Sequence, residues 1–127
     1  MQKCKFRNAL LVIFGIITLM ACTSKTIVVP SIPPPSKVYK FSVDVKPLFT
    51  SHCATAGCHS AGSISPDLTA ANAYQSLMSG NLVNTTTPAS SLIYTVVAPG
   101  GSMNSHLSNS TDQLTILYWI QQGALNN

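Results

Sequence analysis

Charged residues are scarce in this chain of 127 residues, at 8% of the sequence. The carboxylates are Asp44, Asp67 and Asp112, and no Lys or Arg follows Lys46. A nucleic-acid surface needs clustered cations that neutralise phosphates, so this composition excludes a nucleic-acid partner. Three carboxylates also leave few candidates for proton transfer, and we therefore expect a protein that is not an enzyme.

An apolar run long enough to span a bilayer is also missing. The run from Ala9 to Ala21 is too short for a transmembrane helix, but it follows three cations and directly precedes Cys22. This pattern is typical of an export signal and resembles a bacterial lipoprotein signal. The resemblance implies a signal peptide over 1–21, lipid on Cys22, and an exported protein that is anchored to a membrane and faces the periplasm or the cell surface. Thr23, rather than Asp, after the cysteine favours the outer membrane.

The segment after the predicted cleavage site is rich in proline. Four prolines lie between Thr23 and Ser36, and three of them are consecutive, which favours an extended polyproline conformation. We therefore expect residues 22–36 to be the lipidated cysteine and its tether, and residues 37–127 to be the folded domain.

Strand patterns are lacking in the predicted domain, because no alternating apolar stretch is long enough. Helical spacing occurs instead, so the sequence predicts an all-α fold. The first expected helix is 42–52, with Ser42 as N-cap, and the second is 70–78, with Thr69 as N-cap and an end near Gly80. The third is 91–97, although its β-branched residues also suit a strand. The last helix begins with a Ser110–Gln113 capping box and ends at Gly123.

Cysteine is scarce as well, since only Cys53 and Cys58 belong to the predicted domain. Four short helices bury a modest core, and a domain of this size often needs a disulfide, a metal or a cofactor for stability. A haem held by two thioether bonds needs two cysteines and a histidine directly after the second, usually as Cys-x-x-Cys-His. Here the motif is Cys-x-x-x-x-Cys-His59, and its four intervening residues are small.

From residue 41 to residue 127 the chain resembles small c-type cytochrome domains of exported bacterial proteins, the group known as planctomycete-type cytochrome c. The resemblance is carried by segments in a characteristic order: 44–49 (DVKPLF), 53–59 (CATAGCH), 66–68 (PDL), Met103 in a Gly-rich loop, and 119–124 (WIQQGA).

The resemblance implies a small cytochrome c-like helical domain around one covalent haem c. Cys53 and Cys58 would carry the thioethers, and His59 would be the proximal iron ligand. The Pro66 carbonyl would accept a hydrogen bond from His59, and Leu68 would pack on the haem face. The implied function is transfer of single electrons between redox protein partners.

The sixth iron ligand is expected to be Met103, in the loop 98–104, where two glycines permit a close backbone approach. His106 is the main rival ligand and Met78 a weaker one. Two other functions stay open for the chain. One is a copper-binding or copper-delivery lipoprotein that uses thiol, imidazole and thioether donors. The other is a haemless interaction module held by a disulfide between the two cysteines.

Overall fold

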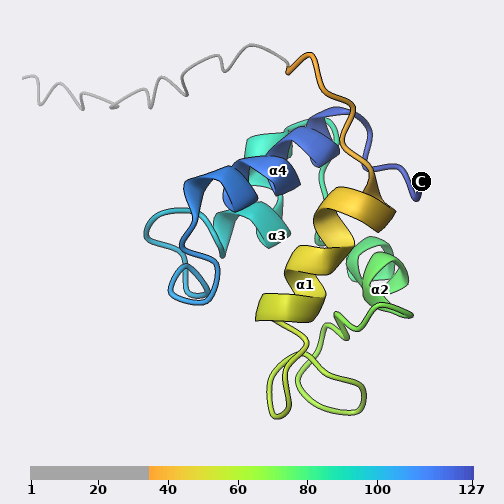
Figure 1. Ribbon diagram of the computed structural model, residues 1–127, viewed down its shortest axis with the longest axis vertical. Coiled ribbons are helices and arrows are strands. Elements are labelled where there is room, and N and C mark those ends of the chain that lie inside the picture. The colour runs from red at the N-terminus through yellow and green to blue at the C-terminus, as the bar shows by residue number, and fades with distance from the viewer. Residues whose placement is uncertain (1–34) are drawn as a thin grey trace, which may run out of the picture. The chain divides into compact units, whose positions relative to one another are not determined.

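The computed structural model describes residues 35–127, and all regular secondary structure in that range is helical. Figure 1 shows the elements as a ribbon. In chain order they are η1 (Phe41–Val45), α1 (Lys46–His52), α2 (Ala73–Ser79), η2 (Pro88–Ser90), α3 (Leu92–Thr95) and α4 (Ser110–Gln121). The predicted all-α class is therefore confirmed for the described residues.

Several predictions fall on other parts of the chain. The signal peptide over 1–21, the lipidated Cys22 and the tether up to residue 34 lie outside the described residues. Within residues 35–127, no helix is long and apolar enough to cross a membrane.

The first helix begins one residue earlier than predicted and has a different cap. Lys40 is the N-cap, with extended backbone, and its N–H donates to the Asp44 carboxylate at 2.8 Å, so Ser42 as N-cap is wrong. The first turn, η1, has π geometry and passes directly into α1. Pro47 has no N–H to donate, and in a regular helix its ring would clash with the Val43 carbonyl, which a widened turn relieves.

The second helix starts three residues later than predicted. The Asp67 carboxylate accepts hydrogen bonds from the Thr69 N–H at 2.9 Å, from the Thr69 hydroxyl at 2.6 Å and from the Asn72 amide at 2.8 Å. These bonds hold residues 69–72 as turns, so α2 begins at Ala73 and Thr69 is not its N-cap. The helix ends at Gly80, as predicted.

The third predicted segment is helical but short. Only Leu92–Thr95 forms α3, and turns follow it. The predicted helix is therefore confirmed, and the strand that its β-branched residues would also suit does not form.

The last helix confirms its predicted end but not its predicted start. Asn109 is the N-cap, because its side chain accepts from the Thr111 N–H at 2.8 Å. The Gln113 amide donates instead to the Leu107 carbonyl at 2.7 Å, so the predicted Ser110–Gln113 capping box does not form. At the other end Gly123 has φ +97°, a conformation that suits glycine and closes the helix.

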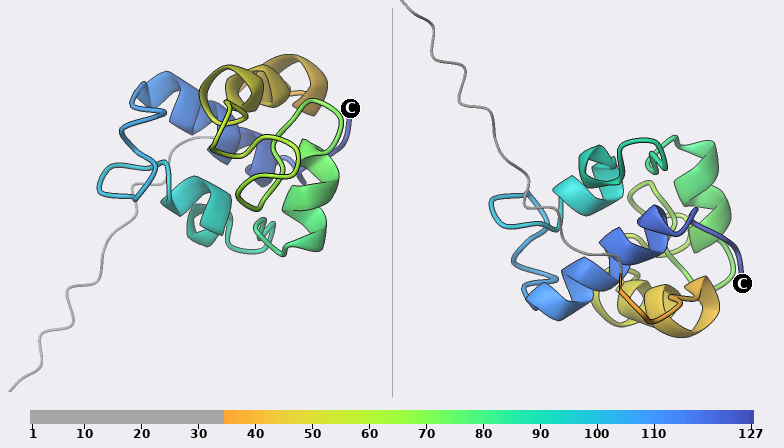
Figure 2. Two further views of the ribbon diagram at one scale, coloured as in Figure 1. Left: turned by 90° about the horizontal axis from the view of Figure 1, so that it is seen from below. Right: turned by 90° about the horizontal axis from the view of Figure 1, so that it is seen from above.

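An aromatic cluster joins the first and last helical elements. The Phe41 ring lies 5.3 Å from the Trp119 ring, 5.2 Å from Tyr74 and 6.5 Å from Phe49, measured between centroids. Helix α4 contacts η1, and the views of Figure 2 show the two elements side by side. The other buried apolar residues around this cluster are Val45, Leu68, Ala73, Leu77, Ile93, Val97, Leu107, Ile116, Ile120 and Ala124.

Hydrogen bonds tie the start of the described chain to its C-terminus. The Tyr39 N–H donates to the Gln122 side chain at 2.8 Å, and the Ser42 N–H donates to the Asn127 carbonyl at 2.9 Å. The start of the described chain and the C-terminus therefore meet beside the N-terminal end of the first helix. The loop that carries the cysteine motif leaves from the other end of that helix (Figure 1).

Candidate functional site

An open, mostly apolar cavity of about 290 Å³ is formed by the C-terminal end of α1, the loop that follows it, α3, and the loop between α3 and α4. Pockets that hold small molecules or cofactors are usually roughly 300–1,000 Å³, so this cavity is at the lower limit of that range. Its lining residues are His52, Cys53, Cys58, His59, Ile64, Pro66, Leu68, Leu82, Leu92, Ile93, Val96, Val97, Ser102, Met103 and His106.

This one cavity contains every residue that the sequence analysis assigned to the haem or its iron. The cysteine motif and Met103 come from loops far apart in sequence, so the tertiary fold is what joins them. His106 lines the same cavity, whereas Met78 lies on α2 and does not line it. The weaker of the two rival ligands is therefore not among the residues that line the cavity.

The cysteine loop is folded so that its extra length points away from the cavity. The His59 N–H donates to the Cys53 carbonyl at 3.0 Å, and the Cys58 N–H donates to the Thr55 carbonyl at 3.0 Å. Residues 55–57 are exposed and do not line the cavity. Gly57 has φ +81°, a backbone conformation that favours glycine at this turn.

Cys53 and Cys58 are free, half-buried thiols. Burial raises the pKa of the Cys53 thiol, and the neighbouring Cys58 adds a smaller effect in the same direction. A raised pKa keeps a thiol protonated near neutral pH, and the redox cysteines of disulfide exchange have a lowered pKa instead. Cys53 therefore lacks the activated thiolate that a disulfide-exchange catalyst needs.

His59 is oriented by two backbone carbonyls. Its Nδ1 lies 3.1 Å from the Pro66 oxygen and 3.1 Å from the Ile64 oxygen. Both neighbours can only accept hydrogen bonds, so we assign the hydrogen of the neutral ring to Nδ1, which leaves a lone pair on Nε2. A metal-ligating histidine is commonly held in this way through its other ring nitrogen.

The loop that carries Met103 is anchored on the end of α3. The Met103 N–H donates to the Val96 carbonyl at 2.7 Å, and the Asn104 amide donates to the Val97 carbonyl at 2.8 Å. A Cβ added at Gly101 would lie 2.3 Å from the Thr95 and Val96 carbonyl oxygens, so only glycine fits there. Gly100 and Gly101 were expected to let the backbone approach the haem, but neither residue lines the cavity. Gly101 instead allows the loop to pack closely against the end of α3.

Sequence reasoning missed several members of this site. His52 is the last residue of α1 and also lines the cavity, and its place directly before Cys53 is the signal that points to it. No sequence motif identifies Leu82, Ile93 and Val96, which form an apolar wall of the cavity. These residues reach the cavity because of the way η2 and α3 pack, and a local sequence pattern does not specify that packing.

Formally charged side chains are absent from the lining of the cavity. No Lys, Arg, Asp or Glu lines it. Within residues 35–127 there is no group of three His, Cys, Asp or Glu side chains that could hold a metal ion.

Comparison of the chain with protein-family models, with curated proteins and with solved structures found no match.

Proposed function

We propose that this chain is an exported, membrane-anchored c-type cytochrome that carries one covalent haem and transfers single electrons between protein partners. The observation that carries the proposal is the shared cavity: two thiols, an imidazole held at Nδ1 and a thioether, from two separate loops, face one apolar space. The helical fold of the described residues supports a small cytochrome c-like domain.

The residues around the cavity suit a large apolar cofactor. Three of its apolar lining residues are exposed: Ile64 at 60%, Leu92 at 54% and Met103 at 37%. Exposed apolar side chains that line the same cavity are characteristic of a binding site. A flat aromatic macrocycle in the cavity would cover these side chains, which supports haem over a single metal ion.

Each predicted residue has a role in this proposal. Cys53 and Cys58 would hold the haem by thioether bonds, and the His59 Nε2 would bind the iron, while the Pro66 carbonyl fixes the ring. Met103 would supply the sixth ligand, and Leu68 would contact the haem face. When bound, a haem iron supplies one-electron redox chemistry whose potential depends on its axial ligands.

One observation favours an electron carrier over an enzyme: none of the three carboxylates lines the cavity. The predicted lipid on Cys22 would hold the domain on a membrane, with the outer membrane favoured by Thr23, and partners would reach it from the periplasm or the cell surface.

Covalent haem attachment tests this proposal directly. The full chain is produced with a cytochrome c maturation system, and the product is assayed by haem staining of a denaturing gel, by intact mass and by the Soret band. We expect a stained band whose mass includes one haem. Cys53→Ser with Cys58→Ser should abolish the stain, and Met78→Ala is the matched control that should retain it.

Other results would identify the alternatives. A mass two hydrogens below that of the reduced chain, with no Soret band, would indicate a disulfide-held module. Stoichiometric copper without a Soret band would indicate the copper-binding function, with Met103 among the donors. Either result ends the haem proposal.

A further inference from the structure

Met103 and His106 belong to one turn that the fold holds beside the cavity. The His106 N–H donates to the Met103 carbonyl at 3.0 Å, and both residues line the cavity. The turn is fixed on one side by the Met103 N–H, which donates to the Val96 carbonyl at 2.7 Å. On the other side it is fixed by buried Leu107, whose carbonyl accepts from the Gln113 amide at 2.7 Å. The backbone of this turn is therefore anchored at both ends, independently of the two side chains.

Both of these side chains are on the surface. Met103 is 37% exposed, and His106 is exposed as well. Exposed side chains change rotamer within nanoseconds, and such a change does not disturb the buried core. The turn therefore offers the cavity two different donors, a thioether sulfur and an imidazole nitrogen, without a rearrangement of the backbone.

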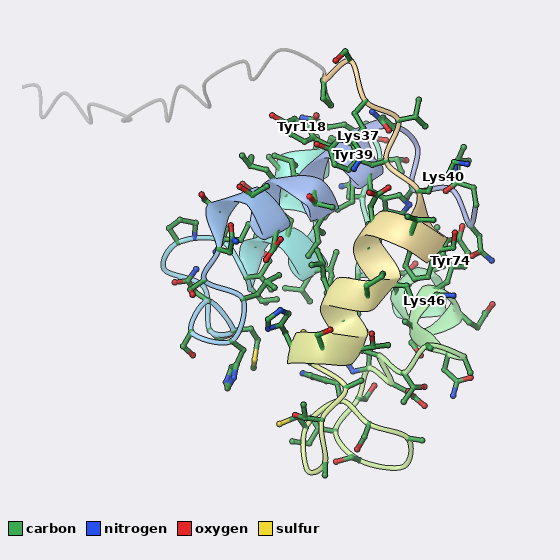
Figure 3. All side chains as sticks on the ribbon, viewed as in Figure 1. Lys37, Tyr39, Lys40, Lys46, Tyr74 and Tyr118 are labelled. Atoms are coloured by element: carbon green, nitrogen blue, oxygen red, sulfur yellow. The ribbon has the colours of Figure 1, made fainter. Side chains whose placement is uncertain are left out.

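Other nitrogen donors of the described residues are less suited to replace the sulfur. Lys37, Lys40 and Lys46 are labelled in Figure 3, and all three lie away from the loop between α3 and α4, which is at the left of that view. None of these lysines lines the cavity. His52 does line it, but His52 comes from the end of α1, whereas His106 comes from the same turn as Met103.

A thioether differs from an imidazole because peroxides oxidise it readily. The sulfur takes one oxygen atom from the peroxide and gives up two electrons, and water is the reduced product. A thioether has two lone pairs, so a sulfur that binds iron through one of them still exposes the other to the oxidant. The resulting sulfoxide is polar, and it is a weaker ligand for haem iron than an imidazole is.

We propose that His106 is a reserve iron ligand, which takes the sixth position when Met103 is oxidised to its sulfoxide. This inference rests on the proposed haem function and adds a regulation of the same site. An imidazole in place of a thioether lowers the redox potential. Peroxide thus converts the carrier to a form of lower potential, and a methionine sulfoxide reductase reverses the change.

The haem-loaded full chain, treated with hydrogen peroxide, provides the test. Peptide mapping by mass locates the added oxygen, near-infrared absorption reports sulfur bound to ferric iron, and electron paramagnetic resonance distinguishes one imidazole ligand from two. We expect oxidation of Met103 to remove the sulfur band, to leave the iron low-spin with the signal of two imidazoles, and to lower the midpoint potential. Methionine sulfoxide reductase should restore the original spectrum and potential.

Met78 is the matched control for the oxidation, because it is 38% exposed but does not line the cavity. Met78→Leu should therefore leave the effect of peroxide on the spectrum unchanged.

Variants that need no oxidant test the ligand itself. Met103→Ala should show the two-imidazole signal without peroxide, and Met103→Ala with His106→Ala should lose this signal and become high-spin. Met103→Ala with His52→Ala is the control, and it should keep the signal of two imidazoles.

The possible results separate this inference from the proposed function. High-spin iron in oxidised protein or in Met103→Ala would contradict the reserve ligand and leave the haem function intact. A two-imidazole signal that is lost with His52→Ala instead of His106→Ala would assign the role to His52. The same signal before any oxidation would make His106 the resting ligand rather than the reserve. A chain that takes up no haem would end the proposed function and this inference together.

Discussion

Met103 and His106 are the two residues that compete for the second axial position on the proposed haem iron. Both line the cavity, and the His106 N–H donates to the Met103 carbonyl at 3.0 Å, so the two side chains belong to one turn. Sulfur and imidazole differ in their effect on the redox potential, because a thioether ligand raises it. The identity of this ligand would therefore set the range of redox potentials at which the haem-loaded protein works.

Replacing Met103 with Ala should remove the weak near-infrared band that arises from sulfur bound to ferric iron, and should lower the midpoint potential. Absorption spectroscopy and a redox titration of the haem-loaded protein measure both effects. Met78→Ala is the control and should change neither, because Met78 lies outside the cavity. If only His106→Ala alters the spectrum, the protein is a bis-histidine cytochrome.

Gly101 allows a test of Met103 positioning that leaves the ligand itself intact. A methyl group at this position would meet two carbonyl oxygens at 2.3 Å, so Gly101→Ala should push the loop away from α3. We expect a weaker near-infrared band and faster binding of exogenous imidazole to the iron, followed by stopped-flow absorbance. Ser102→Ala, in the same loop, should leave both unchanged. An unchanged band in Gly101→Ala would show that the loop position does not control the ligand.

At the scale of elements, the starts of the helices depend on side chains that compete for the same backbone donors. Asn109 accepts from the Thr111 N–H and caps α4, although Ser110 is a good capping residue as well. The Gln113 side-chain amide donates to the Leu107 carbonyl and does not take part in the cap. The cap therefore follows from which residue the preceding loop places at the helix start.

Substitution of this cap should measurably destabilise the domain. Asn109→Ala should lower the free energy of unfolding by about 1 kcal/mol, the usual cost of losing an N-cap. For a domain of this size the melting temperature should fall by roughly 4–8 °C, which circular dichroism resolves. Ser110→Ala should have a much smaller effect, since Ser110 is already within the helix. If Ser110→Ala destabilised the domain more than Asn109→Ala, Ser110 would be the N-cap.

At the scale of the whole molecule, the distribution of charge determines how partners approach. The cavity has no lysine or arginine around it, so the proposed haem edge lacks the ring of cations that steers some carriers to acidic partners. Docking at the proposed haem edge would therefore depend on uncharged contacts rather than on attraction between cations and an acidic partner.

The rate of electron transfer to a partner should consequently depend weakly on ionic strength. Stopped-flow measurements from low to moderate salt should change the second-order rate constant by less than about threefold, because screening acts mainly on charged surfaces. A steep decrease over this range would indicate that a charged group near the cavity, such as Asp67, controls the encounter.

Much of the fold follows from patterns within one turn or one helix. The all-α class, the end of α2 at Gly80 and the end of α4 at Gly123 depend on glycine and on helical spacing, which are local properties. The N-caps Ser42, Thr69 and Ser110 were predicted wrongly, because the neighbouring side chains of Asp44, Asp67 and Asn109 accept hydrogen bonds from the backbone instead.

The sequence by itself determined the chemical content of the candidate site, since Cys53, Cys58 and His59 lie within seven consecutive residues and their spacing is a property of the chain alone. Only the tertiary structure decided which distant residues join them. Packing of α3 and its loop brings Met103 and His106 to the cavity, while Met78 is left on α2. The physical reason is that burial of the apolar core sets the positions of loops, and no local pattern encodes that arrangement.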